Sequence, residues 1–204
     1  APLFIAMSLA FGLAIFMLAL AVCYGREAAL GGAMGGRMAR LLAIFVAAVL
    51  YFTTLQHLTG LYGAGSYGIE RFLLLEGGAI TAMFWLLQVG AGGIVPLALL
   101  LWPLSRQRPP GWSLSAAVLV ILGGLAQVYV IIIGGQSYPL NLFPGYEISS
   151  SFFDGAIASY GPSWPELVLG LGGIALAAMV VMLGLRILPI LPTSIVEKAV
   201  DPPK

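Results

Sequence analysis

The stretch Pro2–Tyr24, PLFIAMSLAFGLAIFMLALAVCY, contains no charged side chain. A helix needs about 20 apolar residues to cross the hydrocarbon core of a bilayer, so this stretch is long enough for one span. Four further apolar stretches follow, at about 41–62, 72–102, 113–135 and 165–188. The sequence therefore predicts an all-α protein, a polytopic transmembrane helix bundle with about five spans over residues 1–192.

The composition of the whole chain excludes a soluble globular domain. Hydrophobic residues make up 60% of the 204 positions and charged residues only 8%, whereas a soluble domain carries about 25% charged residues. The net charge of +1 provides no strong field for nucleic acid. We therefore expect membrane lipid, and no nucleic acid, around this chain.

The basic residues predict how the chain is oriented in the membrane. Cytoplasmic loops collect Lys and Arg, and with five spans all basic residues but Arg71 fall on one side. This places the N-terminus outside and a tail, residues 193–204, in the cytoplasm, with an ordered outer loop at 136–164. The stretch 72–102 is about 46 Å long as a helix, longer than a span needs, so we expect a break at Gly77-Gly78 or near Pro96.

The second predicted span carries a group of polar residues that includes His57, the only histidine. Tyr51, Thr54 and His57 recur every three residues and are expected to share one helix face. Hydrogen bonds between helices account for such a stripe in many membrane proteins. A site for a quinone head group is the alternative, because a quinone carbonyl needs a hydrogen-bond donor and a nearby group that carries its proton.

Two carboxylates, Glu76 and Glu166, fall near the outer ends of predicted spans. Ionisable residues at membrane depth are costly and often functional, but a carboxylate is also favoured at a helix N-terminus. Ser163 and Glu166 fit the S-x-x-E capping box, which predicts a structural role for this pair. Glu76 remains the candidate proton carrier.

Several stretches together resemble the NrfD/polysulfide-reductase family of membrane subunits, which includes the subunit associated with dissimilatory sulfite reduction. The stretches that carry the resemblance are Phe84-Trp-Leu-Leu-Gln88-Val-Gly90, Gly134-Gly-Gln-Ser-Tyr-Pro139, Asp154-Gly155 and Tyr160-Gly-Pro-Ser-Trp-Pro-Glu166. Family members have eight to ten spans, so this chain, with about five, resembles the C-terminal half of a ten-span member. In the family the quinone pocket lies largely in the N-terminal half-bundle.

The resemblance implies a subunit in the bacterial or archaeal cytoplasmic (inner) membrane that exchanges electrons and protons with menaquinone or ubiquinone. It also implies a ferredoxin-like iron–sulfur partner, together with other membrane, cytochrome or catalytic subunits of one complex. One histidine and one cysteine leave no ligand set for a haem or iron–sulfur cluster within this chain.

On this reading we expect His57 to bond a quinone oxygen and Glu76 to carry its proton, with Tyr51, Thr54 and Gln88 lining the site. The alternative is a structural membrane anchor or assembly subunit without a redox site of its own. A transporter or channel half is a third possibility, but it requires broken helices that meet at the midplane.

Overall fold

The computed structural model describes residues 2–101, 110–139 and 155–188. Within these ranges every regular element is helical, and five helices are long and apolar enough to cross a membrane. The all-α fold with five spans is therefore confirmed, and the chain is a multi-pass membrane protein. The expected ordered loop at 136–164 lies partly, and the tail at 193–204 wholly, outside the described residues.

The chain divides into two units, Ala1–Ala158 and Ser159–Lys204. The second contains α9 (Trp164–Ile187). The first contains, in chain order, the elements α1 (Pro2–Tyr24), α2 (Arg26–Leu30), α3 (Gly32–Tyr62), α4 (Tyr67–Arg71), η1 (Phe72–Glu76), α5 (Ala79–Ala82), η2 (Met83–Ile94), α6 (Val95–Leu101), α7 (Pro110–Tyr129), η3 (Val130–Gly134) and α8 (Gly135–Ser137).

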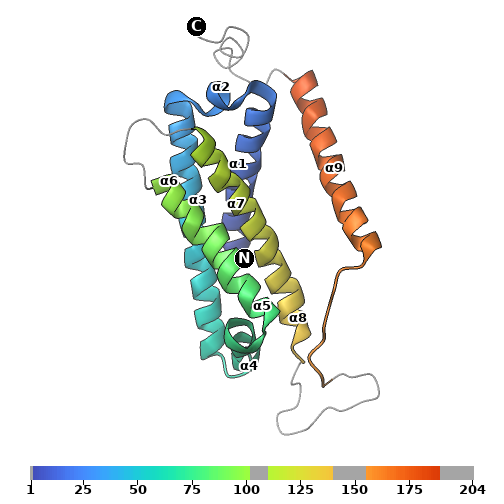
Figure 1. The fold of residues 1–204 in the computed structure, drawn as a ribbon. Coiled ribbons are helices and arrows are strands. Elements are labelled where there is room, and N and C mark those ends of the chain that lie inside the picture. The colour runs from blue at the N-terminus through green and yellow to red at the C-terminus, as the bar shows by residue number, and fades with distance from the viewer. Residues whose placement is uncertain (1, 102–109, 140–154, 189–204) are drawn as a thin grey trace. The chain divides into compact units, whose positions relative to one another are not determined.

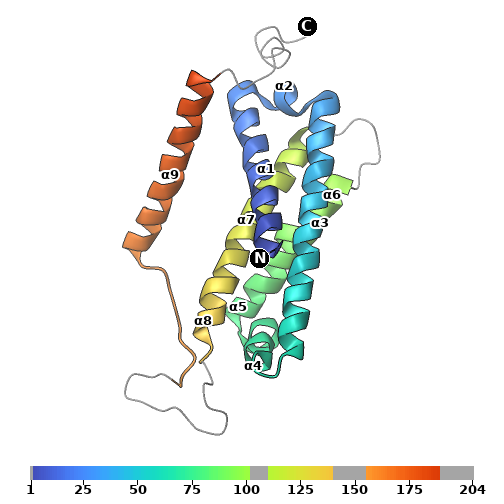
Figure 2. The same cartoon turned by 180° about the vertical axis from the view of Figure 1, so that it is seen from behind.

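The first unit is a bundle in which α1, α3, the continuous helix α5–η2–α6 and the helix α7–η3–α8 lie side by side (Figures 1 and 2). Helix α1 buries residues spaced three or four apart, the period that keeps side chains on one helix face. These residues are Leu3, Ala6, Met7, Ala10, Ala14, Met17 and Leu20. They pack against α3 and α7, while the remaining apolar side chains of α1 are largely exposed, as expected for a helix that faces lipid.

The long third stretch breaks at Gly77-Gly78, which is one of the two positions that its length suggested. Gly78 has a φ of 55°, a conformation that glycine adopts without steric cost. The Gly77 N–H bonds the Phe72 carbonyl at 2.6 Å and the Thr81 hydroxyl at 3.0 Å. The break separates the preceding segment, α4 and η1, from the span that begins at Ala79.

Pro96 does not break the helix. The π-helical turns of η2 end at Ile94, just before it, and the helix continues to Leu101. A proline donates no backbone hydrogen bond and crowds the preceding turn. Local π adjustments are one of the ways in which a membrane helix accommodates a proline.

Small residues set how closely two of the helices approach. The backbones of η2 and α7 meet at Gly92 and Gly123, and a Cβ on either glycine would overlap the other's Cα. Close contact of this kind is typical of helix packing in membranes. It brings the polar side chains of η2 and α7 near each other in the middle of the bundle.

The two ends of the first unit differ in charge. Arg26, Arg37 and Arg40, with Glu27, lie at the end where α1 is joined to α3 through α2, and Glu70, Arg71 and Glu76 lie at the opposite end. Arg106 and Arg108 lie outside the described residues. An outward-facing N-terminus stays a prediction from the positive-inside rule.

Candidate functional site

A buried contact between a histidine and a carboxylate joins two helices at the Glu70 end of the bundle. His57 Nδ1 lies 2.6 Å from Glu70 Oε2, and only 10% and 11% of the two side chains are exposed. His57 belongs to α3 and Glu70 to α4, which follows α3 after a short turn. The contact fastens α4 against the end of α3.

The turn between these helices is built to bring Glu70 back onto α3. The Ser66 hydroxyl donates to the Gly60 carbonyl at 2.7 Å, and the Tyr67 N–H bonds the Gly63 carbonyl at 3.0 Å. Gly60 lies directly beneath the Glu70 carboxylate, where a Cβ would overlap the side chain of Glu70. Glycine at this position therefore makes the space that the carboxylate occupies.

Apolar side chains surround the pair. The Phe84 ring meets the His57 ring edge-on, with 4.8 Å between the centroids. Phe84 also belongs to a buried cluster with Phe72, Leu73 and Val130. Low polarity around two ionisable groups strengthens their attraction, and it also makes an unpaired charge there expensive.

The geometry allows one proton to be shared between an imidazole and a carboxylate. With the proton on Nδ1 the ring donates to Glu70, whether the other ring nitrogen is protonated or not. In the described part of the chain Nδ1 is the ring nitrogen that bonds protein, which leaves Nε2 for a ligand. A histidine held in this way can donate a proton to a quinone oxygen or take one from a quinol hydroxyl.

The predicted polar stripe on α3 does not lie on one face. His57 is buried, whereas Tyr51 is 60% exposed and Thr54 is exposed with its hydroxyl bonded to the Leu50 carbonyl at 2.8 Å. Each step of three residues falls about 60° short of a full turn, so Tyr51 and His57 differ by about 120° around the helix. The inward-facing polar residues are instead Thr53 and His57, which are four apart.

Glu76, the predicted proton carrier, lies at the surface of the same end. Its Oε1 is 2.8 Å from Arg71 Nη2, and about half of each side chain is exposed, 53% and 54%. The structure therefore brings His57 together with Glu70 and not with Glu76. Glu76 is still close along the chain, at the end of the segment that carries Glu70.

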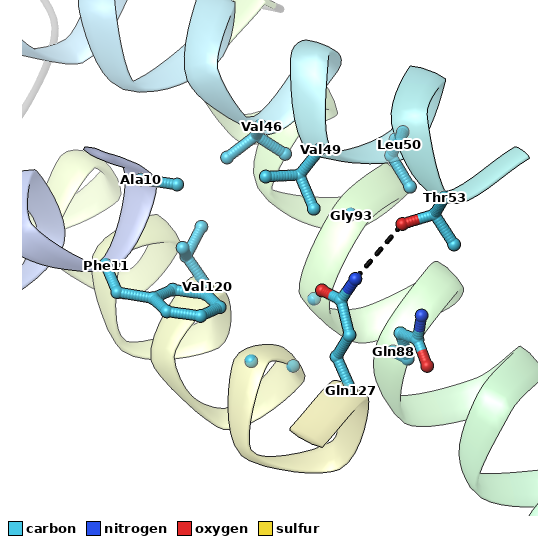
Figure 3. Close-up of a pocket in the computed structure, with 13 residues that line it drawn as sticks. Ala10, Phe11, Val46, Val49, Leu50, Thr53, Gln88, Gly93, Val120 and Gln127 are labelled. Atoms are coloured by element: carbon cyan, nitrogen blue, oxygen red, sulfur yellow. Dashed lines mark hydrogen bonds between the residues drawn. The ribbon is translucent and has the colours of Figure 1, made fainter. Parts of the chain in front are cut away.

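Gln88 lies on the inner face of η2, deeper in the bundle. It lines a small pocket with Thr53 and Gln127, and Gln127 Nε2 donates to the Thr53 hydroxyl at 3.1 Å (Figure 3). Gln88 is 6% exposed, and its Oε1 has no hydrogen-bond partner in the described part of the chain. The space has room for little more than a water molecule, so a quinone ring does not fit it as it stands.

Sequence reasoning missed two residues, Glu70 and Gln127. Both are polar residues within or beside otherwise apolar segments. The spacing of Thr53 and His57 was a usable signal for an inward polar face, but the partners on α4 and α7 are set by how the chain folds back. Among the described residues no group of three His, Cys, Asp or Glu side chains could hold a metal ion.

In the second unit, Ser163 and Glu166 form the N-terminus of α9. The Ser163 N–H donates to Glu166 Oε2 at 2.9 Å, as in a capping box, with Pro165 in the first turn. The Tyr160 hydroxyl donates to the same oxygen at 2.6 Å. These contacts fix the start of the span and give Glu166 a structural role.

One family model and two curated proteins are similar to this chain in sequence. The family model for NrfD, polysulphide reductase, matches residues 1–139. A Halobacterium salinarum protein, named as a putative membrane subunit of dimethyl sulfoxide reductase, is 30% identical over 202 residues, which cover 93% of this chain and 45% of the relative. An Archaeoglobus fulgidus protein named Hdr-like menaquinol oxidoreductase integral membrane subunit is 28% identical over 171 residues, covering 81% and 43%.

The chain thus spans less than half the length of each of these two relatives. No solved structure matches the chain significantly.

Proposed function

Because this chain belongs to the NrfD polysulphide reductase family, we propose that it serves as membrane subunit, or part of one, in a quinone-linked oxidoreductase complex. In this role it exchanges electrons and protons between membrane menaquinone or ubiquinone and an iron–sulfur partner subunit. The relatives' names support this role, since one is called a menaquinol oxidoreductase subunit and the other a reductase membrane subunit.

The observation that carries the proposal is the buried contact between His57 and Glu70. Quinol oxidation releases two protons, and quinone reduction takes up two, so a quinone site needs protonatable groups next to it. Ionisable residues are costly inside a membrane protein and are commonly kept there for such a purpose. This pair is placed in apolar surroundings and bridges two helices.

We assign each residue a role on this basis. His57 bonds a quinone oxygen through Nε2. On the other side of the ring, Glu70 accepts the hydrogen bond from Nδ1 and can share its proton. Glu76, exposed and paired with Arg71, exchanges protons with water at the membrane surface. Tyr51 and Thr54 face outward on α3, where they line the approach of a quinone from the lipid.

A structural anchor is the second candidate, and one observation favours it. His57 and Glu70 satisfy each other, and they tie α4 to α3 in the way that polar residues join helices in many membrane proteins. In this case the pair stabilises the fold and has no part in quinol chemistry.

Quinol turnover by the assembled complex distinguishes the two candidates. In the full-length protein, Glu70→Gln keeps the shape and the hydrogen bond but removes the charge, and His57→Gln removes the imidazole. We expect turnover to fall at least tenfold in both variants, with the complex still assembled. Glu27→Gln, a change of an exposed carboxylate on α2, is the matched control. Normal turnover in both His57 and Glu70 variants would leave the anchor as the function.

A further inference from the structure

The pocket in the middle of the bundle has a polar atom without a partner. Gln88 Oε1 is buried and accepts no hydrogen bond in the described part of the chain. Two other polar side chains line the same pocket, Thr53 from α3 and Gln127 from α7. Their hydrogen bond to each other uses one of the two amide N–H groups of Gln127 and leaves the Thr53 hydroxyl proton free to donate.

A carbonyl oxygen left unpaired in such a place is energetically costly. Buried polar groups in proteins are almost always hydrogen-bonded, either to protein or to an ordered water. Lipid around the bundle offers no donor, so a partner for Gln88 has to come from inside. Thr53 and Gln127, which line the same pocket, still have donors to offer.

The volume of the pocket limits which molecule can bind in it. The helices are held close at Gly92 and Gly123, and a Cβ on Gly93 or Gly124 would overlap Leu50 or Phe11. The space that remains has room for a water-sized group. A water molecule also needs two to four polar partners, and Gln88, Thr53 and Gln127 supply them.

We propose that Gln88, Thr53 and Gln127 together hold a buried water molecule between η2, α3 and α7 (Figure 3). The water donates to Gln88 Oε1 and accepts from Thr53 or Gln127. This inference rests on the pocket and its polar lining, and it does not depend on the proposed quinone chemistry.

The water site adjoins the His57–Glu70 pair through two shared helices. Thr53 and His57 are one turn apart on the inner face of α3. Phe84, which packs on the His57 ring, lies about one turn from Gln88 on η2. The buried polar groups therefore form a line from Glu70 at the end of the bundle to Gln127 in its middle.

Radiolytic hydroxyl-radical labelling of the full-length protein in its native membrane tests the site, because radicals formed from a bound water modify the side chains beside it. Val46 and Val120 line the pocket and are only 2% exposed. Leu42 and Leu100 are equally buried and do not line it, so they serve as dry references. We expect labelling of the two valines to exceed that of the two leucines at least fivefold.

The variant Gln88→Met, of similar length but without the carbonyl, provides the second measurement. It should reduce the labelling of Val46 and Val120 to the level of the dry references and lower Tm, because the water and its other partners lose a hydrogen bond. Gln56→Met, at an exposed position of α3, should change neither. Equal labelling of valines and leucines in the unmodified protein, or a Tm that rises in Gln88→Met, would show that the pocket is dry and contradict the proposal.

Discussion

Glu70 and Glu76 belong to one short segment, yet they lie in opposite surroundings. Glu70 points into the bundle, 2.6 Å from His57 with about a tenth of each side chain exposed. Glu76 faces outward, 2.8 Å from Arg71 with half of each side chain exposed. The distances are nearly equal, so the difference between the pairs is their surroundings. Low polarity makes the inner pair strong and expensive to break, and water makes the outer pair weak.

The largest expected effect is the loss of Glu70. Glu70→Ala leaves the His57 ring buried without its partner, and a buried hydrogen-bonding group left unsatisfied in this way costs about 1–3 kcal/mol, more if the group is charged. The free energy of unfolding, measured by titration with a denaturing detergent, should fall by about that amount. Glu76→Ala, measured in parallel, should change it by less than about 1 kcal/mol. Equal losses in the two variants would break the distinction between the pairs.

A change beneath the buried carboxylate tests the same pair without altering either partner. In Gly60→Ala the new Cβ overlaps the Glu70 side chain, which has to move away from His57. Overpacking of this kind costs about 1–3 kcal/mol. Gly36→Ala on the same helix is the matched control, because a Cβ there meets nothing and alanine is the better helix former. Stabilisation by Gly60→Ala would show that Glu70 does not occupy this space.

The polar contact deeper in the bundle should have an intermediate effect. Thr53→Val keeps the side-chain shape but removes the hydroxyl that Gln127 bonds at 3.1 Å. A hydrogen bond of this kind contributes about 1 kcal/mol, so the free energy of unfolding should fall by about that amount. Thr54→Val, whose hydroxyl bonds only its own helix, should have a smaller effect. Thermal unfolding of both variants in the same detergent checks the difference.

The outer pair should respond to salt, and the inner pair should not. Charges in contact with water are screened over about 10 Å at 0.1 M salt, whereas buried charges are screened much less. Raising the salt concentration to 1 M should erase the small effect of Arg71→Gln on stability and leave that of Glu70→Ala unchanged. A salt-sensitive effect at Glu70 would indicate that the pair is open to water.

The spans could be predicted from the sequence because the requirement is local: about 20 apolar residues in a row. The break at Gly77-Gly78 was predictable for the same reason, since the stretch was too long for one span. The partner of His57 was not predictable from the sequence, because it depends on how α4 turns back onto α3. Glu76 looked equally suitable in the sequence, and only the direction of a short helix separates it from Glu70.

The glycine pairs also show that the sequence predicts local features but not which distant segments meet. Gly92, Gly123 and Gly172 all precede a second glycine in an apolar segment and predict close helix contacts. The structure pairs Gly92 with Gly123, while a Cβ on Gly172 meets no atom within the second unit. Small residues indicate where a close approach is possible, but the partner is decided by packing between distant segments.

The claim that the buried Glu70 changes its protonation when quinol reacts, while Glu76 only exchanges protons with water at the surface, can be tested by infrared difference spectroscopy. Spectra of the full-length complex, recorded before and after reduction with a quinol, report changes in the protonation of buried carboxyl groups. We expect a carboxyl band that is lost in Glu70→Gln and kept in Glu76→Gln. A spectrum without such a band, or a band that survives in Glu70→Gln, would show that Glu70 does not change its protonation when quinol reacts.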